Sequence, residues 1–277
     1  MESALRLALA PIMAKADPRD PIPFLPLICA GDDVTVLLRA KDAIGAAQHF
    51  LEAFEQSSED EFKKSSFPSL RGKHLTACAG VAFVHKAFPF WQAYSLSESL
   101  CRYAKDKTKR ECSALAFWRV TTSVADEFKD IIARELTTQD DTILTMMPYT
   151  TGQGHNDHPR LDDLLTLTDA VEKMPRGSLR GLITEIYSGR QKAQQAFNRI
   201  AQVAKARNKE SSQKLENLQE ALSRLTGQND ESSLWKPLGN KGDKVEKFCT
   251  PLHDALELLV IAGQIDEASM ATTPEEA

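Results

Sequence analysis

The stretch Phe24-Leu-Pro-Leu-Ile-Cys-Ala-Gly-Asp-Asp-Val-Thr-Val-Leu-Leu-Arg39 decides the fold that the sequence predicts. Two adjacent aspartates, Asp32 and Asp33, follow Gly31 between two apolar runs, and these residue types favour tight turns. The pattern predicts a β-hairpin with two carboxylates at its tip. The flanking runs are rich in residues that favour buried strands, namely Leu25, Leu27, Ile28, Val34, Val36 and Leu38.

Two carboxylates on a rigid hairpin can bind divalent metal ions, which activate a hydroxyl and neutralise a triphosphate. An Asp-Asp pair in a hairpin is also ordinary turn chemistry without a catalytic role. Both interpretations of Asp32 and Asp33 stay open from this stretch alone.

The composition is that of an ordinary soluble protein. The 277 residues are 42% hydrophobic and 26% charged, and the net charge of −5 means that any polyanion contact requires a local basic patch. No run approaches the ~18 apolar residues of a membrane span, and the N-terminus is a poor signal peptide. Five scattered cysteines suggest reduced thiols. We therefore expect a cytoplasmic protein without membrane contact.

Helices and strands alternate through the first 120 residues. Apolar residues at helical or strand spacing predict each element. The polar segment 56–73 is expected to be an exposed loop, and the small-residue run at 75–85 is typical of a central strand covered on both faces. The predicted helices cover residues 2–15, 41–56 and 90–106, and the later strands cover residues 75–85 and 113–120. This order predicts a sheet with helices packed against it.

Beyond residue 121 the sequence predicts a mainly helical chain, with one short strand at 143–147 and a loop at 152–159. Helices are expected around residues 161–171 and 179–186, followed by one long helix over about 190–225. A last helix is expected to begin at Thr250-Pro251 and to end at Gly263. The predicted domains are 1–122, a linker region 123–160, a helical domain 161–263 and a disordered tail 264–277.

The first 120 residues resemble the palm domain of the large subunit of type III CRISPR effectors (the Cmr and Csm large subunit), itself related to the GGDEF nucleotide cyclases. Three ordered pieces carry the resemblance: Leu27-Ile-Cys-Ala-Gly-Asp-Asp33, Leu75-Thr-Ala-Cys-Ala-Gly-Val-Ala82 and Ser97-Glu-Ser-Leu-Cys-Arg-Tyr-Ala-Lys105. They are similar to the family's Gly-Gly-Asp-Asp hairpin, its small-residue strand and its helix with a closing Ala-Lys pair. The resemblance implies an α+β fold, a ferredoxin-like palm of the GGDEF or polymerase type, followed by an α-helical domain.

The resemblance also implies roles for four residues. Asp32 and Asp33 would be catalytic and would ligate Mg²⁺ or Mn²⁺. Gly31 and Lys105 would bind nucleotide, Gly31 by letting phosphate or base approach closely and Lys105 as a point cation. A lysine near a helix C-terminus can equally be solvated and interact with the helix dipole.

Two departures from the family pattern bear on activity. Ala30 replaces the first glycine of the Gly-Gly pair. The chain also begins in the helix that should precede the hairpin, so the palm would lack its first strand and the metal-binding aspartate on it. We expect a fragment or half of a split protein, a protein partner that supplies this strand, or a degenerate palm used for binding.

The sequence therefore predicts a palm-fold nucleotidyl transferase or cyclase-like protein. The resemblance implies that it makes cyclic or linear oligonucleotide signals from ATP or another nucleoside triphosphate in antiviral defence. The competing prediction is a catalytically degenerate palm that binds a nucleotide, RNA or a protein partner.

A basic stretch in the second half bears on the RNA prediction. It could face nucleic acid, or it could be a solvated helix face. Its members are Arg176, Arg180, Arg190, Lys192, Arg199, Lys205, Arg207 and Lys209.

Overall fold

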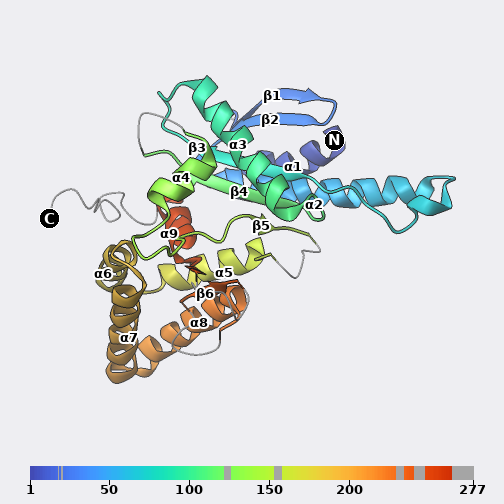
Figure 1. The fold of residues 1–277 in the computed structure, drawn as a ribbon. Coiled ribbons are helices and arrows are strands. Elements are labelled where there is room, and N and C mark those ends of the chain that lie inside the picture. Colours follow the sequence, from blue (N-terminus) through green and yellow to red (C-terminus); the bar gives the residue numbers. More distant parts are fainter. Residues whose placement is uncertain are drawn as a thin grey trace. The chain divides into compact units, whose positions relative to one another are not determined.

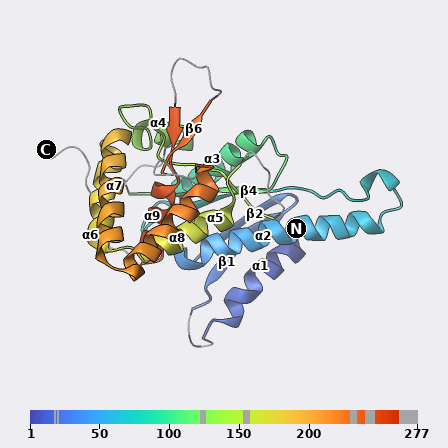
Figure 2. The ribbon, with the colours of Figure 1, turned by 90° about the horizontal axis from the view of Figure 1, so that it is seen from below.

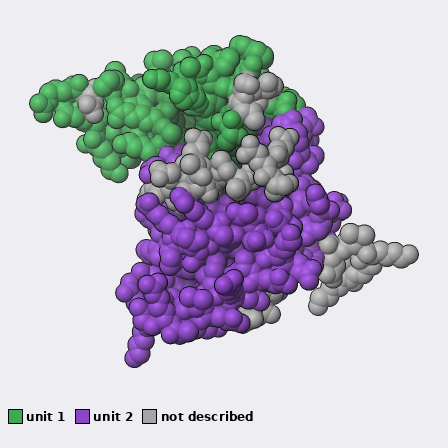
Figure 3. Space-filling view, turned by 90° about the vertical axis from the view of Figure 1, so that its left-hand side faces the viewer, with its two compact units in different colours: residues 1–128, 147–158 green, residues 129–146, 159–277 purple. Residues whose placement is uncertain are grey.

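A computed structural model describes residues 1–17, 19, 21–121, 126–152, 158–228, 234–239 and 247–263. The chain divides into two compact units, coloured separately in Figure 3. Unit 1 comprises residues 1–128 and 147–158, and unit 2 comprises residues 129–146 and 159–277. The fold is α+β, with small sheets and many helices, which confirms the predicted fold class. The predicted domain limits stay predictions.

The predicted hairpin is confirmed as β1 (Phe24–Ala30) and β2 (Asp33–Leu38), which are antiparallel. Ala30 lies opposite Asp33, so Gly31 and Asp32 form a two-residue turn. The expectation that these strands are buried is wrong, because no residue of either strand is fully buried. The two strands pair only with each other within the described residues, so apolar side chains stay accessible, with Leu25 56% and Leu37 45% exposed.

A second sheet in unit 1 has the order β3 (Cys78–Phe83), β4 (Ala114–Arg119) and β5 (Tyr149–Thr150). Strands β3 and β4 are parallel, and β5 runs antiparallel to β4. The prediction that the run at 75–85 forms a central strand is wrong. The central strand in the described part of the chain is β4, whose Leu115 and Phe117 are buried, whereas most of the small residues of β3 are only half-buried.

Helix α3 (Phe90–Thr108) connects β3 to β4 and packs on β3, as Figure 1 shows. The approach is close at Gly80. A Cβ built there would overlap the Ser97 carbonyl oxygen and lie 2.6 Å from the Cys101 backbone nitrogen. The glycine at this position of β3 is therefore a requirement of helix-on-strand packing.

Helices α1 (Glu2–Ala14) and α2 (Ala40–Lys64) pack against each other in unit 1. Helix α1 uses an apolar stripe at helical spacing, since Ala4, Leu5, Ala8 and Leu9 are buried. Both helices were predicted, and α1 agrees with its predicted bounds to within one residue.

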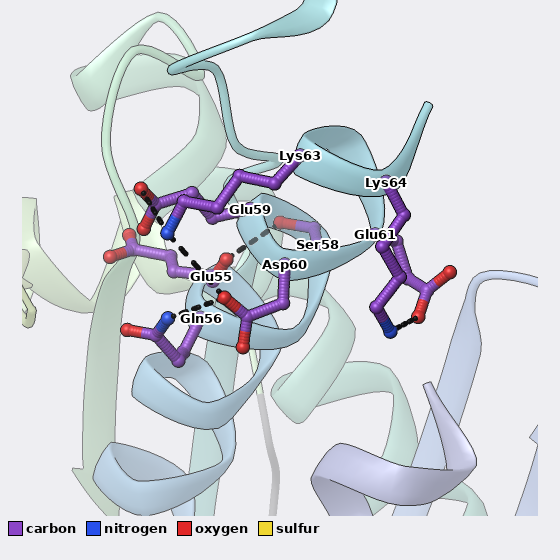
Figure 4. A network of polar contacts seen from close by, with 8 residues as sticks. All are labelled: Glu55, Gln56, Ser58, Glu59, Asp60, Glu61, Lys63 and Lys64. Atoms are coloured by element: carbon purple, nitrogen blue, oxygen red, sulfur yellow. Dashed lines mark hydrogen bonds and ion pairs between the residues drawn. The ribbon is translucent and has the colours of Figure 1, made fainter. Parts of the chain in front are cut away.

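Helix α2 is longer than predicted, so the expected loop at 56–73 is wrong over residues 56–64. Charged side chains one turn apart support this exposed end, as Figure 4 shows. Lys63 Nζ lies 3.0 Å from Glu59 Oε1, and Lys64 Nζ lies 2.8 Å from Glu61 Oε1. Such pairs each stabilise a helix by roughly 0.2–0.5 kcal/mol, so this polar stretch continues the helix.

Unit 2 is mainly helical, with one short hairpin. Within the described residues, its elements are α4 (Phe128–Glu135, whose first residue belongs to unit 1), α5 (Leu161–Glu172), α6 (Arg176–Tyr187), α7 (Arg190–Arg207), α8 (Lys209–Thr226), β6 (Lys236–Leu238), β7 (Lys247–Cys249) and α9 (Leu252–Ile261). The predicted strand at 143–147 is wrong, because Ile143 makes only isolated bridges to Thr137 and Cys249. Residues 153–157 of the predicted loop and the whole predicted tail lie outside the described residues.

The long helix predicted over residues 190–225 is two helices. The chain is extended at Asn208, with φ −165° and ψ 169°, and α8 begins at the next residue. The Asn208 side chain accepts a hydrogen bond of 2.7 Å from the Ser211 backbone nitrogen. Asparagine is among the best N-cap residues, so one side chain ends the continuous helix that the leucine spacing suggests.

Helix α9 anchors the core of unit 2. Thr250 Oγ1 accepts a hydrogen bond from the Leu252 backbone nitrogen at its start, and Gly263 follows its end with φ +72°. Asp254 is fully buried and its Oδ2 accepts hydrogen bonds from Thr145 Oγ1 at 3.0 Å and from Met146 N at 2.9 Å. The helix begins one residue later than Thr250-Pro251 predicts, because Pro251 is its N-cap and not its first residue, and the predicted stop at Gly263 is confirmed.

We expect Gly80→Val to destabilise the protein by about 3 kcal/mol or more, because the new side chain meets the backbone of α3, which cannot rotate away. Gly45→Ala is the matched control. Gly45 lies inside α2 with open space around a built Cβ, so alanine there should stabilise by about 0.5–1 kcal/mol. Urea unfolding measures both, and equal midpoints for the two variants would contradict the packing argument.

We expect Asn208→Ala to lower the free energy of unfolding by about 1 kcal/mol, because the first turn of α8 loses its side-chain cap. Asn208→Asp keeps an oxygen acceptor and should retain most of the stability. Chemical unfolding followed by far-ultraviolet circular dichroism tests the difference, and identical curves for the alanine and aspartate variants would refute the capping role.

Candidate functional site

The turn of the β1–β2 hairpin is built around Gly31. Its φ is +63°, whereas Asp32 has no positive φ, and this is the pattern of a two-residue turn with glycine at the first position. A built Cβ on Gly31 meets nothing within 4 Å. Glycine is therefore required by the backbone conformation, and the space beside the turn is open to an approaching ligand.

Asp32 and Asp33 are both exposed at this turn. Asp32 is the second turn residue, and Asp33 is the first residue of β2. In the part of the chain that the structure describes, neither carboxylate makes a hydrogen bond or an ion pair. The fold therefore presents two adjacent negative charges without compensating them, which favours binding of a cation.

Helix α3 brings two further side chains into this region. The Tyr94 hydroxyl donates a hydrogen bond of 2.8 Å to Glu98 Oε1. This hydrogen bond raises the pKa of Tyr94, and the negative charges of Glu98 and Asp33 raise it further. Of the two hairpin aspartates, Asp33 is the one whose charge acts on Tyr94, and its effect is smaller than that of Glu98.

Lys105 occupies a different part of α3. It follows Tyr94 by eleven residues, which corresponds to about 16 Å along a helix axis. Its positive charge acts on the thiols of Cys78 and Cys101, where it opposes the rise in pKa caused by burial. Among the described residues, no hydrogen bond or ion pair joins Lys105 to the hairpin. The structure thus groups Gly31, Asp32 and Asp33 and places Lys105 along the helix.

The donor set limits the kind of metal site that the hairpin can form. Among the described residues, no group of three or more His, Cys, Asp or Glu side chains could hold a metal ion. Mg²⁺ usually keeps several waters and is bound by one or two carboxylates together with substrate phosphates. Asp32 and Asp33 therefore fit a magnesium ion that arrives with a triphosphate, and they do not form a cage of protein ligands.

Sequence reasoning did not select Tyr94 or Glu98 as site residues. The sequence did contain a signal for their contact, because Tyr94 and Glu98 are four residues apart on a predicted helix and such residues lie on one helix face. The electrostatic effect of Asp33 on Tyr94 could not be predicted, because it depends on the tertiary fold.

Comparison with known proteins agrees with the fold of unit 1. Residues 25–114 match the family model described as Cas10/Cmr2, second palm domain. No curated protein matches the chain. The matched range contains the hairpin except Phe24, all of β3 and α3, and every predicted site residue. For these residues it confirms the resemblance stated from the sequence, to the palm domain of the type III CRISPR large subunit. Within the described residues, no helix is long and apolar enough to cross a membrane.

We expect Glu98→Gln to lower the pKa of Tyr94 towards the ordinary tyrosine value, because the hydrogen bond to the carboxylate favours the protonated phenol. Asp33→Asn should lower it by a smaller amount. Nuclear magnetic resonance of ring-labelled tyrosine, assigned with Tyr94→Phe, measures both pKa values. An unchanged pKa in Asp33→Asn would separate the hairpin from this part of α3.

Proposed function

We propose that this chain is a palm-fold nucleotidyl transferase or cyclase-like protein that makes cyclic or linear oligonucleotide signals in antiviral defence. Its substrate would be a nucleoside triphosphate, ATP being the expected one, used with Mg²⁺ or Mn²⁺. The observation that carries the proposal is the exposed Asp32-Asp33 pair on a tight hairpin turn, inside the range matched to the palm family.

Asp32 and Asp33 would hold the metal ion through carboxylate oxygens, while the triphosphate supplies further oxygens. When bound, the metal would stabilise the attacking and leaving oxygens of nucleotidyl transfer. The pKa of Tyr94 is raised above an ordinary value that already keeps the phenol neutral near pH 7, so Tyr94 would add no negative charge to that of the aspartates. Lys105 would contact phosphate only if the bound nucleotide extends along α3.

The exposed hairpin also supports a protein partner. Both faces of β1 and β2 remain accessible, and the strands pair with no third strand within the described residues. An unpaired strand edge can accept a strand from another chain, with apolar side chains adding affinity. A partner that adds a strand would cover Leu25, Leu27, Ile28 and Leu37 and could bring a further carboxylate.

The second candidate function is a binding subunit without catalysis. It is favoured by the small donor set, since no group of three or more potential metal ligands lies among the described residues. On this alternative, the hairpin would bind a nucleotide, RNA or a protein partner, and the aspartates would only form the turn.

Labelled nucleoside triphosphates incubated with Mg²⁺ or Mn²⁺ test the proposal, with and without the proteins encoded beside the gene. We expect the wild type to form product and Asp32→Asn/Asp33→Asn to lose it by roughly a hundredfold or more. Glu61→Gln is the matched control, because Glu61 is an exposed acidic residue of the same unit, at the far end of α2.

Product that persists in the double variant would show that the metal assignment is wrong. If no protein combination forms product but labelled nucleotide still binds, the binding subunit is the better description.

A further inference from the structure

Helix α7 has an unusual charge composition for a protein of net charge −5. Its sequence, Arg-Gln-Lys-Ala-Gln-Gln-Ala-Phe-Asn-Arg-Ile-Ala-Gln-Val-Ala-Lys-Ala-Arg over residues 190–207, contains five basic residues and no acidic one. A concentrated positive charge on a negatively charged chain points to a local role for that charge.

The basic side chains of α7 lack the ion pairs that are found on other helices of the chain. On α8, Lys214 lies 2.6 Å from Glu210 and Arg224 lies 2.7 Å from Glu220. On α2, Lys64 is paired with Glu61. No ion pair between described residues involves a basic side chain of α7. The helix itself contains no carboxylate, and Glu210, three residues after Arg207, is paired with Lys214 on α8. The charge of α7 is therefore available to a partner.

Three of these cations lie on the solvent side of α7. Lys192, Arg199 and Arg207 are exposed, whereas the opposite side of the helix buries Ala193, Phe197, Ala201 and Ala204. Seven residues separate Lys192 from Arg199, which corresponds to about two turns and about 10 Å, and Arg207 lies about 12 Å further along. Figures 1 and 2 show α7 as a long helix alongside α6 within unit 2.

Local helix physics explains only some of these charges. Arg190 stacks on Phe248, with 3.7 Å between the guanidinium carbon and the ring centroid. Lys205 and Arg207 occupy the last turn, where cations favour the helix dipole. Lys192, by contrast, lies in the first turn, where the dipole disfavours a cation. A residue placed against the local preference indicates a role outside the helix.

The side chains beside these cations indicate which chemical class of partner the helix would bind. Gln195 and Gln202 are exposed on the same side as Arg199, and amides beside cations are suited to phosphate and sugar oxygens. The aromatic residue of α7, Phe197, is buried, so this helix offers no platform for stacked bases. We infer that the α7 surface, formed by Lys192, Gln195, Arg199, Gln202 and Arg207, binds the phosphate backbone of nucleic acid without sequence preference.

This surface belongs to unit 2 and lies outside the range matched to the palm family. It requires no chemistry at the hairpin. Loss of Asp32 and Asp33 should leave it intact, so its test is independent of the proposed transferase.

The test is fluorescence anisotropy with a labelled single-stranded RNA of mixed sequence and an RNA duplex of equal length, measured over a salt series. We expect Lys192→Gln/Arg199→Gln/Arg207→Gln to weaken binding by roughly tenfold to a hundredfold near 0.1 M salt. The logarithmic salt slope should fall by about 2 for the single strand, because each lost phosphate contact accounts for about 0.7. Glutamine keeps helix propensity close to that of lysine and arginine, so α7 should still form.

The matched control removes three cations that have carboxylate partners: Lys64→Gln/Lys214→Gln/Arg224→Gln. It changes the net charge equally and should bind RNA as the wild type does. Binding of either RNA form that is lost only in the α7 variant supports the inference. Three results would overturn it. The wild type could fail to bind RNA, the two triple variants could lose binding equally, or the wild type could bind polyglutamate, a polyanion without phosphates, as tightly as RNA.

Discussion

The close packing of α3 on β3 is the constraint on which unit 1 depends. At Gly80 the helix backbone occupies the space that any side chain would need. This contact fixes the height and direction of α3 over the sheet. On this helix the Tyr94 hydroxyl is bonded to Glu98, and Lys105 lies eleven residues further along, where its charge acts on Cys78. A single missing Cβ in β3 therefore sets how closely α3 can approach the sheet.

The conformation of the hairpin turn, unlike the packing of α3, depends on its own residues and not on contacts with other elements. Its geometry is local: a glycine with positive φ and a two-residue turn hold Asp32 and Asp33 on an open tip. Two adjacent carboxylates in water repel each other weakly, because water screens their charges, whereas the same pair in a closed site would repel strongly. The open tip thus lets the chain carry two adjacent carboxylates without a compensating cation among the described residues.

Local signals explain what the sequence could predict. The Gly-Asp-Asp turn, the apolar stripe of α3 and the Thr250-Pro251 helix start each depend on neighbouring residues, and all three are present. The failures came from non-local or competing effects. Ion pairs around Lys63 extend α2, and Asn208 caps a new helix within a continuous leucine pattern. The exposure of the hairpin and the distance of Lys105 from it depend on tertiary placement, which no pattern along the chain records.

The apolar, exposed hairpin has a practical consequence for the purified protein. Monomeric proteins rarely leave a strand pair with several large aliphatic side chains in water, because its free edges can pair with another copy. Its colloidal behaviour should therefore worsen steeply with concentration, and a modest negative charge offers little protection. A cell would limit this hazard most simply by producing the chain together with a polypeptide that covers the hairpin.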